Sequence, residues 1–226
     1  MRKLLLLLCV PLIFSCGENN DKENSLALYK KNLEVCKNYA KAQEEFDIET
    51  IDNLLTEDFE GYIYPANSPK GIMFNKNQII NDLLFQKEIG IATQFKHTVY
   101  LPGMDTVNLQ MDGSVRVYFA FSSSLQGEEI SLTCYQTIDF KDGKISRLDL
   151  FMDRSGVTNF VNSIFCVSED CINGANDTIN YINTDGELIK QYIGGFKNGK
   201  FHGEGTFTDN KDVYKGIFEN GTFIGE

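Results

Sequence analysis

The chain has 226 residues and a formal net charge of −11 at pH 7, with 42% hydrophobic and 12% aromatic residues. This composition is ordinary for a folded chain, and the length allows one core domain with a small additional module. Because an acidic surface repels nucleic acid and anionic lipid headgroups, neither is expected as a partner.

The first residues have the pattern of an export signal. Two basic residues, 2–3, precede an apolar run at 4–14, whose 11 residues are about half of what a helix needs to cross a bilayer. The run ends at Cys16 in the sequence IFSC, which resembles the lipobox of bacterial lipoproteins. The resemblance implies cleavage before Cys16, lipidation of its thiol and anchoring at the cell envelope, with the outer membrane as the expected location. The alternative is that Cys16 is a disulfide partner or an incidental cysteine.

Four cysteines lie beyond this signal. Cys166 and Cys171 enclose only four residues, and an exported protein sits in an oxidising compartment, so we predict a disulfide between them. Cys36, on a predicted helix, and Cys134, on a predicted strand, are expected as small buried residues rather than as a second bridge. The two histidines show no ligand spacing with the cysteines, so no zinc site or other metal site is expected.

The first 90 residues are predicted to contain a polar tether, three helices and a strand. The polar segment 18–25 lacks apolar periodicity and is expected to be a tether that begins at residue 16. Apolar residues at spacings of three and four predict three helices, at residues 26–40, 49–55 and 76–89. Asn75 is the expected N-cap of the third helix, and residues 58–64 are predicted to be a strand.

After Gly90 the apolar period changes to two. It predicts five strands, at residues 95–101, 106–111, 115–125, 130–140 and 145–152. Asp-Gly or Gln-Gly pairs at 112–113, 126–127 and 142–143 predict hairpin turns. The expected fold class is α+β, an antiparallel sheet that curls around three helices packed on its concave side.

Two stretches resemble the NTF2-like, or SnoaL-like, superfamily: LLTEDFEGYIYP at 54–65 and FKDGKISRLDLFMD at 140–153. The resemblance covers about residues 26–165 and implies a cone with a central pocket. Where relatives similar to limonene epoxide hydrolase carry a catalytic acid, this sequence has Leu150. The resemblance and strand alternation together predict an apolar pocket lined by Phe119, Phe121, Leu148, Leu150 and Met152.

The C-terminal segment repeats itself with a period of 22 residues. YIGGFKNGKFHGEG at 192–205 is matched by YKGIFENGTFIG at 214–225. Both copies resemble the MORN repeat, which implies a module of β-hairpins over residues 166–226. The motif positions are Tyr192, Gly194, Phe196, Gly199, His202, Gly203 and Gly205 in the first copy, and Tyr214, Gly216, Phe218, Gly221 and Gly225 in the second. By this resemblance His202 has a structural role.

These observations divide the chain into a signal peptide at 1–15, a tether at 16–25, an NTF2-like domain at 26–165 and the repeat module. We expect a non-enzymatic envelope lipoprotein that binds a small apolar ligand or a protein partner, with the repeats as the interaction module. Membrane attachment through Cys16 is expected, no cofactor is expected, and a monomer and a homodimer both remain open.

The alternative function is a SnoaL-like lyase, isomerase or hydrolase that acts on a hydrophobic molecule. Its candidate catalytic residues are Asp58, Tyr62, Tyr64 and His97. Convergence of two or more of these, or of Tyr118, in the cavity would favour an enzyme. A closed cone filled with Phe, Leu and Met would favour a scaffold.

Overall fold

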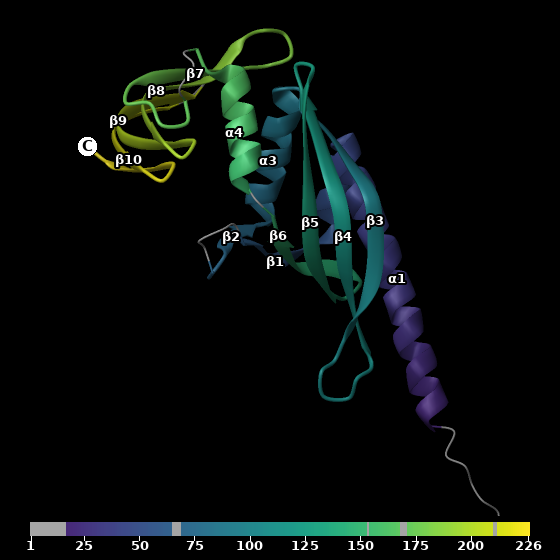
Figure 1. The fold of residues 1–226 in the computed structure, drawn as a ribbon. Helices are drawn as coiled ribbons and strands as arrows, with labels where there is room; N and C mark the ends of the chain where they lie inside the picture. Colours follow the sequence, from purple (N-terminus) through teal and green to yellow (C-terminus); the bar gives the residue numbers. More distant parts are fainter. Residues whose placement is uncertain (1–16, 65–68, 153, 168–170, 210–211) are drawn as a thin grey trace, which may run out of the picture.

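The computed structural model describes residues 17–64, 69–152, 154–167, 171–209 and 212–226, which form two β-sheets and four helices (Figure 1). Cys16 and the apolar run before it lie outside the described residues, so export and lipidation stay predictions. Among the described helices, none is both long enough and apolar enough to cross a membrane.

Three helices come early in the chain, as predicted: α1 (Gly17–Glu45), α2 (Ile48–Leu54) and α3 (Lys76–Glu88). Asn75 caps α3 in a capping box, in which its side chain accepts from the Gln78 backbone and the Gln78 side chain accepts from the Asn75 N–H. The helix α1 begins at Gly17, so the segment 18–25, which is expected to be a tether, is helical.

The larger sheet contains β1 (Leu55–Tyr64), β2 (Ile72–Asn75), β3 (Ala92–Met104), β4 (Met111–Leu125), β5 (Glu128–Lys141) and β6 (Lys144–Phe151), in the order β2-β1-β6-β5-β4-β3. All neighbours are antiparallel except β1 and β6, which pair in parallel. The sheet is therefore mixed, whereas the sequence suggested a purely antiparallel one.

Two hairpin turns were predicted correctly and one was not. Both residues of 126–127 and of 142–143 have positive φ, as a tight hairpin turn requires. Residues 112–113 instead lie inside β4, and the predicted strand at 106–111 is mostly a loop. In that loop the Asp105 carboxylate accepts hydrogen bonds from the backbone N–H groups of Val107 and Asn108, which holds a turn where the apolar alternation suggested a strand.

The helices α1 and α2 cover the concave face of the larger sheet. Their buried residues Cys36, Tyr39 and Ile51 pack against residues of β4, β5 and β6 in one apolar core. The Asn32 side chain fixes α1 on β4 by donating a hydrogen bond of 2.8 Å to the Gly113 carbonyl. Cys36 and Cys134 are buried free thiols, as predicted.

A fourth helix, α4 (Arg154–Phe165), which the sequence analysis did not predict, leads to the smaller sheet (Figure 1). The predicted disulfide between Cys166 and Cys171 follows it. The smaller sheet contains β7 (Asp177–Ile182), β8 (Leu188–Lys197), β9 (Lys200–Asp209), β10 (Val213–Glu219) and β11 (Thr222–Gly225). They pair antiparallel in sequence order.

The 22-residue repeat corresponds to two hairpins, β8–β9 and β10–β11. The Asn-Gly pairs at 198–199 and 220–221 form their turns, and all four residues have positive φ. Tyr192 is fully buried, and its ring stacks on Phe201 at 3.8 Å between centroids. A Cβ on Gly205 would collide with the Tyr192 ring, so glycine is required there. The repeated glycines and aromatics are thus the packing elements of this sheet.

The Cys166–Cys171 disulfide should stabilise the junction between α4 and β7. Closing so short a loop is worth about 2 kcal/mol through the reduced entropy of the unfolded chain. We expect dithiothreitol to lower the free energy of unfolding of the wild-type protein by about that amount in urea titrations. The Cys166→Ser/Cys171→Ser variant is the control, because its stability should no longer respond to the reductant. An equal response of both proteins would contradict the prediction.

Candidate ligand-binding cavity

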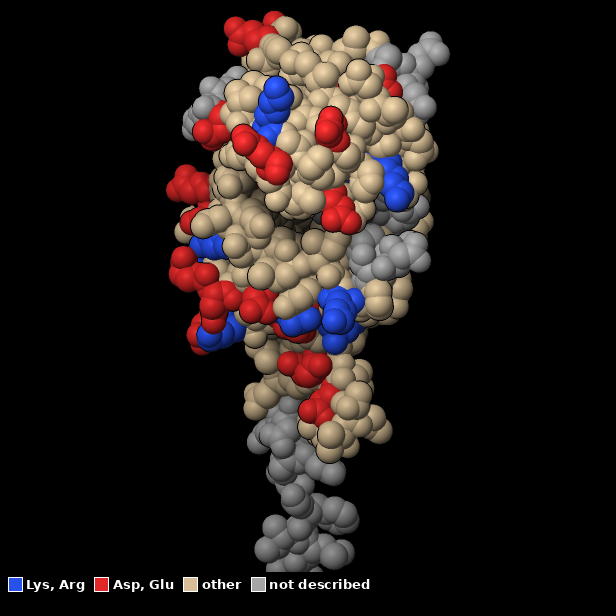
Figure 2. Space-filling view, turned by 90° about the vertical axis from the view of Figure 1, so that its left-hand side faces the viewer, with Lys and Arg blue, Asp and Glu red and all other residues tan. Residues whose placement is uncertain are grey.

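A cavity of about 600 Å³ lies between the concave face of the larger sheet and the helices. Figure 2 shows the surface hollowed below the smaller sheet, with mostly uncharged residues around the hollow. The sheet side of the wall contains all five residues expected there: Phe119, Phe121, Leu148, Leu150 and Met152. Inward and outward residues alternate along a strand, so β4 and β6 each present one apolar side to the cavity.

The helical side of the wall includes residues that the sequence analysis did not select. Leu83, Phe85 and Ile89 belong to α3 or its C-terminal end, while Phe160 and Asn162 belong to α4. Tyr181, from β7 of the smaller sheet, completes this side. These residues are distant in sequence. They lie together because α4 places the smaller sheet at the end of the cavity.

Neutral polar side chains form part of the wall. Tyr39 is 2% exposed, and its hydroxyl has no hydrogen-bond partner among the described residues. Burial raises the pKa of Tyr39 above its ordinary value, so the hydroxyl stays protonated at neutral pH and can donate. Gln43, Cys134 and Gln136 also line the cavity, and burial raises the pKa of the Cys134 thiol to about 11. This part of the wall therefore consists of neutral polar side chains from α1 and β5.

The four candidate catalytic residues do not line this cavity. The exposed Asp58 carboxylate pairs with the Lys141 ammonium at 2.7 Å, and this hydrogen bond lowers the pKa of Asp58. Tyr62 and Tyr64 project from the opposite face of β1, since Ile63 between them lines the cavity. His97 is exposed at an irregularity of the β3–β4 pairing, with a φ of 53°.

An aromatic row covers part of this outer face of the larger sheet. Tyr64 stacks on Phe151 at 4.7 Å, and the row continues through Tyr135 to Tyr118. The guanidinium of Arg147 lies 4.5 Å from the centre of the Tyr62 ring at the other end. Tyr118 is thus outside the cavity as well. The five residues whose convergence would have favoured an enzyme are therefore all elsewhere.

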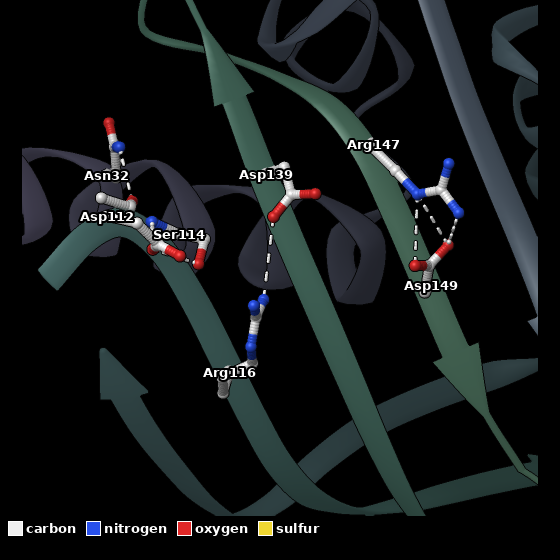
Figure 3. Close-up of polar contacts among 8 residues, drawn as sticks. Asn32, Asp112, Ser114, Arg116, Asp139, Arg147 and Asp149 are labelled. Carbon is white, nitrogen blue, oxygen red and sulfur yellow. Dashed lines mark hydrogen bonds and ion pairs between the residues drawn. The ribbon is translucent and has the colours of Figure 1, made fainter. Parts of the chain in front are cut away.

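Ion pairs also lie away from the cavity (Figure 3). Arg147 pairs with Asp149 at 3.1 Å on β6, and Arg116 of β4 lies 3.7 Å from Asp139 of β5. Burial raises the pKa of Asp139, although the Arg116 charge acts in the opposite direction. None of these four residues lines the cavity. In the part of the chain that the structure describes, no cluster of three or more His, Cys, Asp or Glu could hold a metal ion.

No family model and no curated protein matches the sequence. Solved structures do match the first domain. An NTF2-like protein from Burkholderia xenovorans LB400 is 13% identical, with a TM-score of 0.43, and the match covers 55% of this chain and 90% of that one. An LEH-like epoxide hydrolase of M. tuberculosis is 14% identical, with a TM-score of 0.41 over 55% of this chain and 84% of the hydrolase.

A phenazine biosynthesis-related protein from Pseudomonas aeruginosa is 17% identical, with a TM-score of 0.44 over 57% of this chain and 84% of its own. The helices on a curved mixed sheet make the first domain an α+β domain, and the five-stranded sheet is additional to it. Proteins with this fold catalyse different reactions or none, so the fold does not define an activity.

Removal of the Tyr39 hydroxyl should cost the ligand-free protein no stability. The hydroxyl has no partner to lose, so Tyr39→Phe is expected to leave the free energy of unfolding within about 0.5 kcal/mol of wild type or to raise it. Phe119→Ala, in the same wall, should instead lose about 3 kcal/mol of buried contacts. Urea titrations measure both values. A loss above about 1 kcal/mol in Tyr39→Phe would mean that the hydroxyl has a partner.

Proposed function

We propose that the cavity binds a small, uncharged and largely apolar molecule, and that the chain does not transform it. The supporting observation is a cavity of about 600 Å³ with mostly apolar walls and a few neutral polar side chains. That volume lies within the range of about 300–1,000 Å³ typical of small-molecule sites. The candidate catalytic residues, Asp58, Tyr62, Tyr64 and His97, all lie outside the cavity.

The charge of the wall favours a neutral ligand. Among the described residues that line the cavity, Asp82 is the sole charged side chain, and it lies on the exposed side of α3. A charged ligand would lose its hydration without gaining an opposite charge, which is unfavourable. Gln43 and Gln136 add neutral amide groups to the wall. We infer a ligand with a carbonyl or ether oxygen that can accept a hydrogen bond from such an amide.

The envelope location and the repeat assignment belong to the same proposal. The lipobox pattern that ends at Cys16 supports a lipid-anchored protein of the outer membrane. The glycines and aromatics of residues 192–225 support MORN repeats, and their hairpins offer a surface to a protein partner. In this account a lipoprotein holds a small molecule in one domain and presents an interaction module beside it.

Ligand binding can be tested with prodan, a neutral naphthalene ketone whose fluorescence shifts to the blue in apolar surroundings. Leu150→Trp should narrow the cavity with a large ring and weaken prodan binding about tenfold or more. Phe151→Trp is the matched control, because the adjacent side chain points to the outer face, and its affinity should equal that of wild type. Equal binding by both variants, or no binding by the wild type, would contradict the proposal.

Lipidation can be tested independently of the cavity. Cys16→Ser is expected to remove the lipid and to move the protein from the membrane fraction to the soluble fraction, because the thiol is the proposed attachment point. Mass spectrometry of the N-terminal peptide and fractionation of cells measure the two effects. A Cys16→Ser protein without lipid that still sediments with membranes would contradict the anchor.

A further inference from the structure

Two buried hydroxyls face the cavity where β3 pairs with β4. Thr93 and Ser123 lie opposite each other, both line the cavity, and their side-chain oxygens are 3.4 Å apart. They are 7% and 3% exposed, and neither hydroxyl has another hydrogen-bond partner among the described residues. The pair carries two hydroxyl hydrogens, and its mutual contact uses one of them. One buried donor therefore remains, and buried donors in proteins are normally paired.

Two amides form a second polar patch in the same wall. Gln43 of α1 and Gln136 of β5 line the cavity, and both are half-buried. Neither side chain has a hydrogen-bond partner in the part of the chain that the structure describes. An amide has two N–H donors and a carbonyl acceptor, so this patch can bind an oxygen or a hydroxyl of a ligand.

The two patches lie at different levels of the larger sheet. Gln136 pairs with Val117 of β4, and Ser123 follows Val117 by six residues on the same strand. Because a strand rises about 3.4 Å per residue, the patches are about 20 Å apart along β4. A single polar group of a ligand cannot make hydrogen bonds to both patches over that separation.

An aromatic band lies between the two patches. Along this interval β4 presents Phe119 and Phe121 to the cavity. The ring of Phe95, from β3, lies 5.2 Å from the Phe119 ring and 5.9 Å from the Phe121 ring, centroid to centroid. These rings offer dispersion contacts and no hydrogen bonds, so the part of a ligand beside them must be apolar.

We propose that the ligand is an elongated molecule with an apolar middle and a neutral hydrogen-bonding group at each end. One end contacts the amides of Gln43 and Gln136, and the other end contacts the hydroxyls of Thr93 and Ser123. This inference rests on the proposed ligand site and narrows the class of ligand that the site takes. A molecule with one polar end leaves one patch without a partner, which favours a molecule with two.

Two decane derivatives test this inference: n-decanol, and the terminal diol, which has a second hydroxyl at the other end of the chain. Isothermal titration calorimetry of the full chain gives their dissociation constants. Thr93→Val/Ser123→Ala replaces the hydroxyl pair with apolar side chains of similar shape and should weaken binding of the diol about tenfold. The affinity for n-decanol should change by less than about twofold, because its single hydroxyl can still contact the amides.

Ser122→Ala is the matched control. Ser122 precedes Ser123 in β4 but does not line the cavity, and its hydroxyl donates to the Glu129 carboxylate, so its loss should leave the ratio of the two affinities unchanged. An unchanged ratio in Thr93→Val/Ser123→Ala would overturn this inference alone, provided that the wild type binds n-decanol. The same fall in Ser122→Ala would also overturn it. Wild-type protein that binds neither compound would contradict the proposed function as well.

Discussion

The alternation of side chains along the larger sheet is the constraint on which the rest of the structure depends. On β6, Leu150 points into the cavity, while its neighbours Asp149 and Phe151 point to the opposite face. A shift of one residue in register would place the Arg147–Asp149 pair against the apolar helices and expose the cavity wall. The same alternation places the charged side chains of β1, β4 and β5 outside the cavity.

The cavity lowers the stability of the ligand-free fold. Protein interiors are normally close-packed, and unfilled volume beside a core forfeits dispersion contacts. Here α3, α4 and the smaller sheet hold a space of about 600 Å³ open against the larger sheet. An apolar ligand would restore those contacts. The arrangement fits a binding site better than a scaffold with a solid core.

Local signals predicted much of the fold. The Asn75 cap, the hairpin turns at 126–127 and 142–143 and most of the period-two strands are each determined by neighbouring residues, and they appear where the sequence indicated. Long-range contacts decided the rest. The parallel pairing of β1 with β6 and the placement of Asn162 and Tyr181 in the wall depend on parts of the chain that are distant in sequence. Tyr39 lies within the helix predicted at 26–40, but the lack of a partner for its hydroxyl among the described residues is visible only in three dimensions.

The central claim is that the first domain holds a small neutral molecule. Native mass spectrometry of the full chain, purified gently from its own cells, tests it most directly. The account predicts a species heavier than the bare chain that loses its extra mass on collisional activation and that is absent from the Leu150→Trp variant. Wild-type protein found only at the mass of the bare chain would contradict the account.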